Sequence, residues 1–500
     1  MLAAIPSAAV LGIDGYPVTV EVHVAAGLPA YDLVGLPDAA GRESRERVRA
    51  AILSSNLEWP MRRITVNLAP AVLRKAGTGL EAAIACAILA ASDQLPEGAL
   101  NRTAVIGELG LDGTMRHVPG TLVIVDTLAR QGIERVIVPL GSATEAALVH
   151  GIEILPIANL AELTACLKGE WRWADIPEAT TTVAAPSLND ALDLGEVRGL
   201  SNARTALAAA AAGGHHLLFV GPPGAGKTML AKRFPTIVDE LDQQHALEVT
   251  RITSAAGIPT HGRLVSTPPF QAPHHSASAA ALIGGGTGGR VRLGEITLAH
   301  RGALFLDELG EFSPCVLDAL RQPLEDRIIH ISRAGISAQL PADFTLIACC
   351  NPCPCGLGGN ACRCNEVMRA RYRRRLSGPL LDRFDLRIMV EGPGPNDERG
   401  PSSAATKAVV LAAIALQRER YRDTPIRRNA EIPQRWLERY APLDHTASTV
   451  LRDISEMRSL TGRGVARIWR VARTLADLEL RPSISCEHID TASNMREEII

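Results

Sequence analysis

The chain has 500 residues, 46% of them hydrophobic and 21% charged, with a formal net charge of −2. This composition excludes wholesale disorder and a polycationic chain, so any contact with nucleic acid has to come from local basic patches. The sequence has no apolar run of about 18 residues and no start typical of a signal peptide, so we expect no membrane segment and a cytoplasmic location. In such a reducing compartment the ten cysteines are not expected to form disulfides.

The first block, residues 1–172, alternates strand-like runs with alanine-rich helical stretches. Residues 18–22, 63–68 and 135–138 have the composition of strands, and residues 44–56 have the periodicity of an amphipathic helix. The pattern predicts an α/β domain. Residues 173–192 contain prolines and a threonine run, which indicate a linker between domains.

The second block, residues 193–392, opens with an apolar strand that runs into a glycine-rich loop and then a helix. The loop has the spacing G-x-x-x-x-G-K-T, in which backbone N–H groups surround phosphate oxygens. Its lysine, Lys227, is expected to reach the outer phosphates, and Thr228 to hold Mg²⁺. The sequence therefore predicts that a nucleoside triphosphate binds at Gly221, Pro222, Pro223, Gly224, Ala225, Gly226, Lys227 and Thr228.

Two further strands of this block end in polar residues that suit phosphoryl transfer. Residues 303–306 are followed by Asp307 and Glu308, which we expect to hold Mg²⁺ and to polarise the attacking water. Asn351 follows residues 344–350 and can orient that water. Taken alone, each of these polar residues could belong to an ordinary strand end. The catalytic interpretation depends on their position after the phosphate loop.

Two arginines are candidates for neutralising charge on the γ-phosphate. Arg383 precedes a strand at 386–390, and Arg463 opens a helix. The alternative for any single arginine is an ordinary surface residue. The helix of Arg463 belongs to the last block, residues 393–500, where residues 404–421, 433–440, 447–460 and 465–478 are predicted to be helical with no strand between them.

The order of these motifs resembles an AAA+ ATPase of the magnesium-chelatase class. Residues 273–278, with the glycine run 284–286, are similar to the insertion that this class carries ahead of its second nucleotide motif. Residues 327–335 are similar to the β-hairpin that precedes the sensor asparagine. The resemblance implies a parallel-sheet P-loop core followed by a helical C-terminal lid.

The first block is similar to the ComM/YifB family at residues 35–38, 43–51, 64–70 and 107–113, so the resemblance covers nearly the whole chain. It implies a Lon-protease-like N-terminal domain, with the fold of ribosomal protein S5 domain 2. Such a peptidase needs a hydroxyl nucleophile beside a lysine. Gly79 and Leu122 stand where those two residues would be, and Thr78 has only Lys75 nearby, so we expect a proteolytically inactive domain.

The resemblance further implies a homohexameric motor that drives branch migration of branched or single-stranded DNA, with Arg383 acting on a neighbouring subunit. Arg290, Arg292 and Arg333 lie in the insertion and the hairpin, where they either contact DNA phosphates or are solvated loop residues. The basic run 369–375 is either a phosphate-contacting patch or a helix face at an interface, and we favour the second.

Four cysteines flank a glycine-rich turn, Cys353, Cys355, Cys362 and Cys364. Four thiolates satisfy a tetrahedral Zn²⁺, although C-x-C pairs are less typical of such sites than C-x-x-C, and free thiols are the alternative. His274 and His275 are expected to pack on neighbours rather than to bind metal.

Two other functions fit the nucleotide motifs. One is the ATPase subunit of a metal chelatase, which is not expected to carry the N-terminal domain. The other is an ATPase that remodels proteins, with the N-terminal domain as an adaptor. Stimulation of ATP turnover by DNA separates the motor from both.

Overall fold

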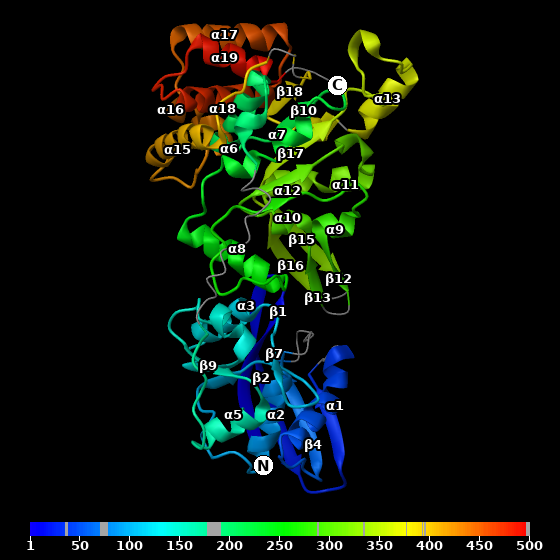
Figure 1. The fold of residues 1–500 in the computed structure, drawn as a ribbon, viewed down its shortest axis with the longest axis vertical. Coiled ribbons are helices and arrows are strands. Elements are labelled where there is room, and N and C mark those ends of the chain that lie inside the picture. Colours follow the sequence, from blue (N-terminus) through cyan, green and yellow to red (C-terminus); the bar gives the residue numbers. More distant parts are fainter. Residues whose placement is uncertain are drawn as a thin grey trace.

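The computed structural model describes residues 1–35, 39–70, 79–177, 192–287, 290–333, 336–376, 378–392, 394 and 397–496. Figure 1 shows an elongated molecule in which the N-terminal α/β region forms one end. The phosphate-loop region lies in the middle, and the C-terminal helices pack beside it at the other end. No helix in the described ranges is long and apolar enough to cross a membrane. Most of the predicted linker, residues 178–191, lies outside the described residues.

The N-terminal region is built on two small sheets with helices packed against them. One sheet has the strand order β1-β2-β4-β3 and the other β5-β8-β9, and β6 pairs with β7. The elements are β1 (Leu2–Leu11), β2 (Asp14–Ala25), β3 (Ala30–Val34), α1 (Ala39–Ser54), β4 (Arg63–Ala69), α2 (Glu81–Ala91), β5 (Thr103–Val105), β6 (Glu108–Leu109), β7 (Met115–Arg116), α3 (Thr121–Arg130), β8 (Arg135–Pro139), α4 (Ala143–Ala146), β9 (Glu153–Ile157) and α5 (Leu160–Leu167).

Helix α2 is the centre of this region and is apolar all round, as expected of a helix buried on every side. Its one carboxylate, Glu81, is buried but satisfied. Arg47 lies 2.7 Å from it, and the backbone N–H of Leu109 donates to it at 2.9 Å. A buried charge without such partners would cost several kcal/mol, so this contact fixes α1 and β6 against α2.

The middle of the chain forms a five-stranded parallel sheet in the order β11-β14-β17-β10-β18. Its elements are α6 (Ser201–Gly213), β10 (Leu217–Val220), α7 (Lys227–Ala231), α8 (Gln243–Ala255), β11 (Phe270–Gln271), α9 (Ala279–Ile283), β12 (Gly284–Thr287), β13 (Arg290–Leu293), α10 (Glu295–Leu298), β14 (Ala303–Leu306), α11 (Pro314–Ala319), α12 (Arg321–Asp326), β15 (Ile328–Arg333), β16 (Ile336–Pro341), β17 (Thr345–Cys350), α13 (Glu366–Arg375), α14 (Gly378–Leu381) and β18 (Leu386–Met389).

The central strands of this sheet are buried throughout and read as continuous apolar runs, as parallel strands covered on both faces do. Because they are parallel, their carboxyl ends meet at one edge. Gly221 follows β10 there, Asp307 follows β14 and Asn351 follows β17. The amino ends of the same strands form the opposite edge, which we call the amino edge.

In the described part of the chain, two of the places where the N-terminal region contacts the middle region involve the β1–β2 turn and helix α8. The turn between β1 and β2 meets the hairpin β15–β16, since a Cβ on Gly12 would lie 3.1 Å from Leu340 Cδ2. At the second place the end of α8 meets the start of α3, where Gly120 N–H donates to the Ser254 carbonyl at 2.9 Å. The Ser254 hydroxyl also donates to the buried carboxylate of Glu145.

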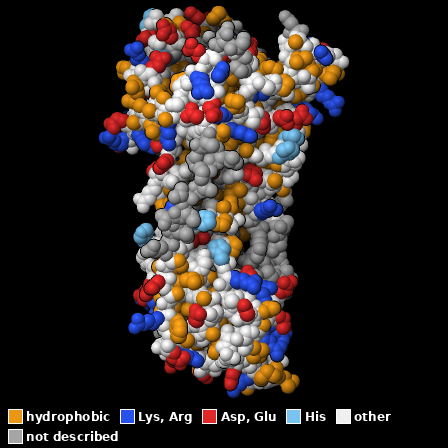
Figure 2. Space-filling view, viewed as in Figure 1, with side chains coloured by type: hydrophobic (Ala, Val, Ile, Leu, Met, Phe, Trp, Pro, Cys, Tyr) orange, Lys and Arg blue, Asp and Glu red, His pale blue; other side chains and the backbone are white. Residues whose placement is uncertain are grey.

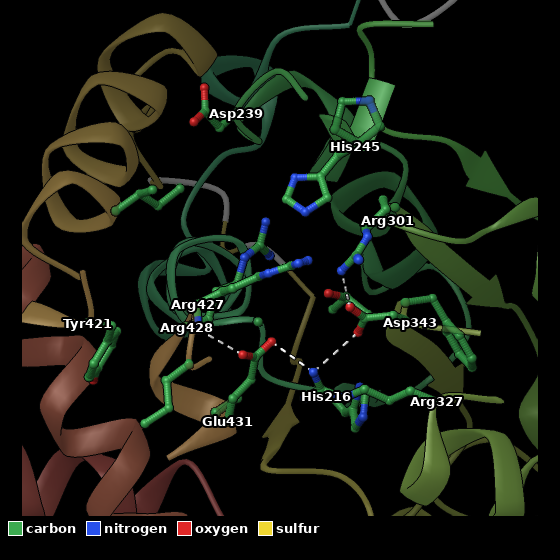
Figure 3. Close-up of a pocket in the computed structure, with 18 of the residues that line it drawn as sticks. His216, Asp239, His245, Arg301, Arg327, Asp343, Tyr421, Arg427, Arg428 and Glu431 are labelled. Carbon is green, nitrogen blue, oxygen red and sulfur yellow. Dashed lines mark hydrogen bonds and ion pairs between the residues drawn. The ribbon is translucent and has the colours of Figure 1, made fainter. Parts of the chain in front are cut away.

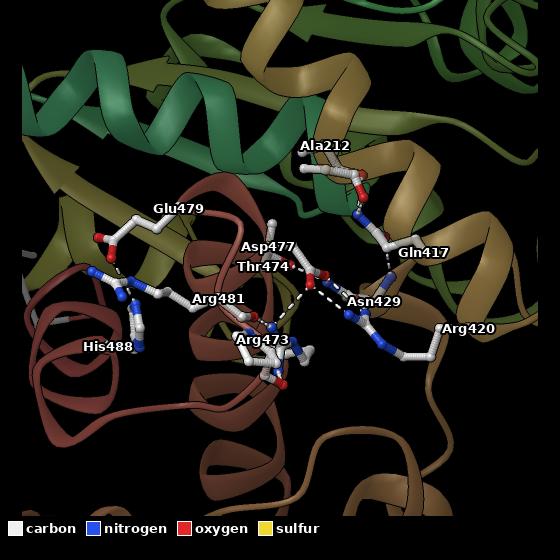
Figure 4. Close-up of polar contacts among 12 residues, drawn as sticks. Ala212, Gln417, Arg420, Asn429, Arg473, Thr474, Asp477, Glu479, Arg481 and His488 are labelled. Atoms are coloured by element: carbon white, nitrogen blue, oxygen red, sulfur yellow. Dashed lines mark hydrogen bonds and ion pairs between the residues drawn. The ribbon is translucent and has the colours of Figure 1, made fainter.

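The C-terminal region is helical, with α15 (Ser403–Arg420), α16 (Leu437–Tyr440), α17 (His445–Met457), α18 (Gly462–Leu478) and α19 (Cys486–Asn494). Helix α19 was not expected from the sequence, and of the expected helix 433–440 only Leu437–Tyr440 is α-helical, since Gln434–Trp436 forms a 3₁₀ turn. Figure 4 shows the polar network that joins these helices around the buried Asp477. Arg420, Asn429 and Arg473 donate to this carboxylate at 2.9, 2.8 and 3.0 Å.

Candidate nucleotide-binding site

The loop 221–226 forms a tight turn between β10 and α7 that leaves no room for side chains at its start. A Cβ on Gly221 would lie 2.1 Å from the carbonyl oxygen of Val390. Gly226 has φ +92° and precedes the first turn of α7. Glycine alone adopts both conditions without strain, so the turn requires glycine at these two positions.

Lys227 is only 8% exposed and lies under this loop. Its ammonium donates to the carbonyl oxygens of Gly221 and Pro222 at 2.6 and 2.8 Å, and to Asn351 Oδ1 at 3.2 Å. Burial lowers the pKa of Lys227, although nearby acidic groups oppose the shift. The strand ends of β10 and β17 thus bring together a lysine and an amide that are 124 residues apart.

Thr228 and Asp307 are the hard oxygen donors of the site. The Thr228 hydroxyl donates to Asp307 Oδ2 at 2.9 Å. A hydroxyl and a carboxylate side by side are the ligand types that Mg²⁺ takes, together with waters and substrate phosphates. The two side chains therefore fit the predicted magnesium site.

Glu308 is held in the left-handed conformation, with φ +52°, directly after β14. Its carboxylate lies 3.2 Å from His275 Nδ1, and His275 stacks on His274 with ring centroids 4.0 Å apart. A non-glycine residue at positive φ costs energy and is found where a side chain has to be aimed. Sequence reasoning expected His275 to pack on a neighbour but gave no signal that Glu308 is its partner.

Asn351 is anchored from a second side. The Tyr372 hydroxyl of α13 donates to the Asn351 carbonyl at 3.0 Å, and the Tyr372 ring fills the space beside Gly310. Nothing in the spacing of Tyr372 within a run of arginines pointed to this contact. Tyr372 is the one buried residue of α13, and the arginines of this helix are mostly exposed.

Arg383 and Arg463 do not lie at the edge of the sheet that carries Lys227. Arg383 precedes the amino end of β18 and pairs with Glu325. Arg463 is exposed in the first turn of α18. One turn later on that helix, Arg467 donates to the Arg383 carbonyl at 2.9 Å, so the two candidate arginines share one side of the molecule.

A cavity of about 530 Å³ opens at the amino edge, beneath the C-terminal helices. Figure 3 shows its arginines and carboxylates pointing toward one another. Arg327 Nη1 lies 2.9 Å from Glu431 Oε1 and 3.6 Å from Asp343 Oδ1, while Arg301 also pairs with Asp343. None of the phosphate-loop residues lines this cavity, so it is separate from the nucleotide site.

The four cysteines after Asn351 gather in one cluster. Their sulfur atoms all lie within 4.8 Å of one another, and all four thiols are free. Backbone N–H groups of Leu357 and Arg363 lower the pKa of Cys355 to about 5, whereas desolvation raises that of Cys364 to about 12. The donor set is compatible with a Zn²⁺ site.

Gly79 and Leu122, which stand where the nucleophile and the lysine of a peptidase dyad would be, carry no reactive side chain. A Cβ on Gly79 would lie 2.8 Å from Val118 Cγ1. Leu122 is fully buried, with its backbone N–H donating to Glu145 at 3.0 Å. Lys75 and Thr78 lie outside the described residues.

The candidate DNA-contacting arginines are only partly described. Arg292 is exposed on β13, whereas the side chains of Arg290 and Arg333 lie outside the described residues. On the face drawn in Figure 2, basic and acidic side chains are interspersed rather than gathered in a band. In the basic run, Arg373 pairs with Glu366 and Arg369 donates to the Cys364 carbonyl.

Three family models match the chain in succession. Residues 20–142 match the model for subunit ChlI of magnesium chelatase, residues 193–397 that for magnesium chelatase subunit ChlI, and residues 400–496 that for the C-terminal part of ChlI. With the parallel sheet and its phosphate loop, these matches make the chain an AAA+ ATPase of the magnesium-chelatase type.

Relatives that match over nearly the whole chain identify the family within this class. The protein YifB of Salmonella typhimurium is 40% identical over 501 residues, which cover 99% of this chain and 97% of YifB. The competence protein ComM of Haemophilus influenzae is 41% identical over 506 residues, with the same shares. The chain belongs to the ComM/YifB family. A shorter stretch of 135 residues, 27% of this chain and 14% of the other, is 30% identical to the DNA replication licensing factor mcm6 of Dictyostelium discoideum.

Proposed function

We propose that this protein is an ATP-driven motor that works on DNA as a ring of six copies and moves the branch points of recombination intermediates. The observation that carries the proposal is the separation of the two halves of the catalytic apparatus. Lys227, Thr228, Asp307 and Asn351 meet at the carboxyl edge of the sheet, and Arg383 lies beyond its amino edge.

This separation favours a site completed by a second copy. Strand β18 runs parallel to β10, with Leu386 beside Leu217 and Met389 beside Val220. Four strand residues span about 13 Å, and Arg383 lies three residues before that span. Its own phosphate loop is therefore out of reach, and it can neutralise phosphate charge only on a neighbouring copy.

Within one copy, each residue at the carboxyl edge has a distinct task in this proposal. The loop N–H groups and Lys227 bind the phosphates, and Thr228 with Asp307 holds Mg²⁺, which supplies charge neutralisation between phosphate oxygens. Glu308 accepts the proton of the attacking water, and Asn351 orients it. The cofactors are ATP, Mg²⁺ and, in the four-cysteine cluster, Zn²⁺.

DNA as the substrate is supported by the names of relatives rather than by a basic surface. One relative is a competence protein and another a DNA replication licensing factor. The hairpins β12–β13 and β15–β16 carry Arg290, Arg292 and Arg333, which are the candidates for phosphate contacts in the ring. Sequence-independent phosphate contact is what a translocating motor requires.

The test is ATP-dependent branch migration of a synthetic four-way junction by the full chain, with Lys227→Ala as the inactive control. We expect wild type to resolve the junction only with ATP, and linear, forked and junction DNA to raise ATP turnover. Turnover raised by unfolded protein but by none of the DNAs would favour the protein-remodelling function. Turnover that responds to neither, but to a tetrapyrrole-metallating partner complex, would favour the chelatase function.

A further inference from the structure

The loop between Asn351 and α13 contains the most compact set of metal-ligating side chains in the described part of the chain. The Sγ atoms of Cys353 and Cys355 are 3.3 Å apart, those of Cys353 and Cys362 3.5 Å, and those of Cys355 and Cys362 3.8 Å. Four thiolates at about 2.3 Å from Zn²⁺ form a tetrahedron with edges of about 3.8 Å. A disulfide would need about 2.05 Å, so the spacing is that of ligands around an ion.

The backbone around the four cysteines directs N–H groups at their sulfur atoms. The N–H groups of Cys355, Arg363 and Cys364 donate to sulfur atoms of the cluster at 3.3 to 3.5 Å. Between the two cysteine pairs, Gly356 and Gly358 have φ +80° and +65°. These left-handed residues let the chain reverse while its N–H groups point at the sulfurs, which stabilises charged thiolates.

The same loop packs directly on the nucleotide site. A Cβ on Gly356 would lie 2.9 Å from Pro223 Cδ, in the phosphate loop, and 3.9 Å from Asn351 Nδ2. Cys353 follows Asn351 by two residues, and Asn351 Oδ1 accepts from Lys227. The far end of the loop is held by Arg369, whose guanidinium donates twice to the Cys364 carbonyl at 3.3 Å.

We propose that the four cysteines bind one Zn²⁺ and that this ion positions the phosphate loop and Asn351. The nucleotide site then depends on a metal whose first ligand, Cys353, follows Asn351 by two residues. This proposal rests on the proposed phosphate-binding role of the loop and adds a requirement to it. Without the ion, the segment 352–364 holds four free thiols close together with no bond between them. Pro223 then loses its packing partner, and Asn351 loses its fixed distance from Lys227.

The experiment uses the full chain and four variants. Metal content is measured by mass spectrometry, nucleotide affinity with a fluorescent ATP analogue, and ATP turnover without DNA. We expect about one Zn²⁺ per chain in wild type. The double variant Cys355→Ser, Cys362→Ser should lose the metal and bind nucleotide at least about tenfold more weakly. Its turnover should fall about 100-fold, as misplacement of reacting groups by about 1 Å does.

The controls separate the metal from the thiols and from the phosphate loop. Cys315→Ser removes an exposed thiol of α11 and should change none of the three measurements. Cys355→His keeps a zinc ligand and should retain metal and turnover. Lys227→Ala should keep the metal while losing nucleotide, and a nucleotide-binding Lys227→Ala would overturn the phosphate-loop assignment rather than the metal site.

A second arm avoids reliance on variants that fold poorly. Wild type is stripped with a thiol-modifying mercurial and chelator, the mercurial is reversed with dithiothreitol, and ZnCl₂ is added. Affinity and turnover should fall on stripping and return with Zn²⁺. Wild type without zinc, or with iron in its place, overturns the zinc site. A metal-free protein with unchanged nucleotide affinity and turnover overturns the positioning role.

Discussion

Glu308 and His275 are the residues whose placement says most about the chemical step. Glu308 has a left-handed backbone, and its carboxylate lies 3.2 Å from His275 Nδ1. His275 comes from the insertion that precedes β12, more than thirty residues earlier in the chain. The insertion is thereby in direct contact with the residue proposed to activate water.

Replacement of Glu308 by glutamine should separate binding from hydrolysis. The amide has the same shape, so ATP affinity should stay within about threefold of wild type, but it cannot take a proton and turnover should fall about 100- to 10,000-fold. Affinity and turnover are measured on the same preparation. The neighbouring acid Glu311 is the matched control, and Glu311→Gln should hydrolyse ATP normally; equal loss in both variants would contradict the role of Glu308.

The residues that the sequence could locate are those with fixed spacing within one motif or at strand ends. Lys227, Thr228, Asp307 and Asn351 were expected together because the two strand ends follow the phosphate loop in the order of the nucleotide motifs, and the structure places them within hydrogen-bonding distance. His275 and Tyr372 could not be located in this way. Their contacts depend on how the insertion and α13 fold back over the sheet, which no local pattern encodes.

At the level of elements, strands were easier to predict than helix ends. The runs 18–22, 63–68 and 135–138 lie within β2, β4 and β8, because alternation or continuous apolarity reports burial directly. Helix α19 was missed because its polar sequence buries only a few residues, among them Ile489 and Ala492. The sequence predicts a helix over 433–440, but a 3₁₀ turn at Gln434–Trp436, capped by Pro433, leaves only α16 as α-helix.

Two histidines at the amino edge make the stability of the central sheet sensitive to pH. Burial lowers the pKa of His216 and of His300 to about 4, and each accepts a backbone N–H at Nδ1, from Leu346 and Asp343. An unfolded histidine has a pKa of about 6.5. Between pH 6.5 and 4 the unfolded chain therefore binds protons that the folded chain does not, so the free energy of unfolding falls as the pH falls.

The expected slope is about 1.4 kcal/mol per pH unit for each histidine. Urea unfolding at pH 7, 6 and 5 measures it, and His216→Gln should remove the share of one histidine, since burial also lowers the pKa of His245 and His300. Asp385 does not contribute in this window. Burial would raise its pKa, but His215 and Arg467 outweigh burial and hold the pKa below its usual range, so its stabilisation is lost only at lower pH. A stability independent of pH from 7 to 5 would contradict the buried neutral histidines.

The C-terminal helices depend on one buried carboxylate. Asp477 is fully buried and accepts from three side chains of α15, α18 and the segment between them (Figure 4). Asp477→Ala leaves Arg473, itself 1% exposed, without a neutralising carboxylate and should destabilise the region by about 3–5 kcal/mol. Thermal unfolding measures the loss, and the exposed Asp453 of α17 provides the control, since Asp453→Ala should change stability by less than about 0.5 kcal/mol.

At the scale of the whole molecule, the two edges of the sheet predict complementation between defective copies. Lys227→Ala spoils the carboxyl edge of a copy and Arg383→Ala the amino side. In a mixed ring, an Arg383→Ala copy still holds ATP, and a Lys227→Ala neighbour still supplies Arg383. We therefore expect each variant alone to be inactive and their equimolar mixture to regain about a quarter of wild-type turnover.

The mixture is measured after subunit exchange. The control is a mixture of the Lys227→Ala variant with the double variant that carries both Lys227→Ala and Arg383→Ala, because no interface in it combines an intact Lys227 with an intact Arg383. Turnover that stays at the level of the separate variants would place Arg383 in its own subunit or outside the reaction. If the mixture forms intact rings in solution and its turnover still does not rise, the shared site is excluded.

Helix α8 gives this arrangement a mechanical consequence. Its first turn, with His245, borders the amino-edge cavity, and Glu248 in its middle pairs with Arg301. Its last turn is fastened to the N-terminal region through Ser254 and Glu145. The helix is about 20 Å long, and it connects the amino-edge cavity with the N-terminal region. In the proposed ring, a neighbour that docks at the amino edge and shifts this helix would also tilt the N-terminal region, so that the orientation of that region would follow the state of the adjacent copy.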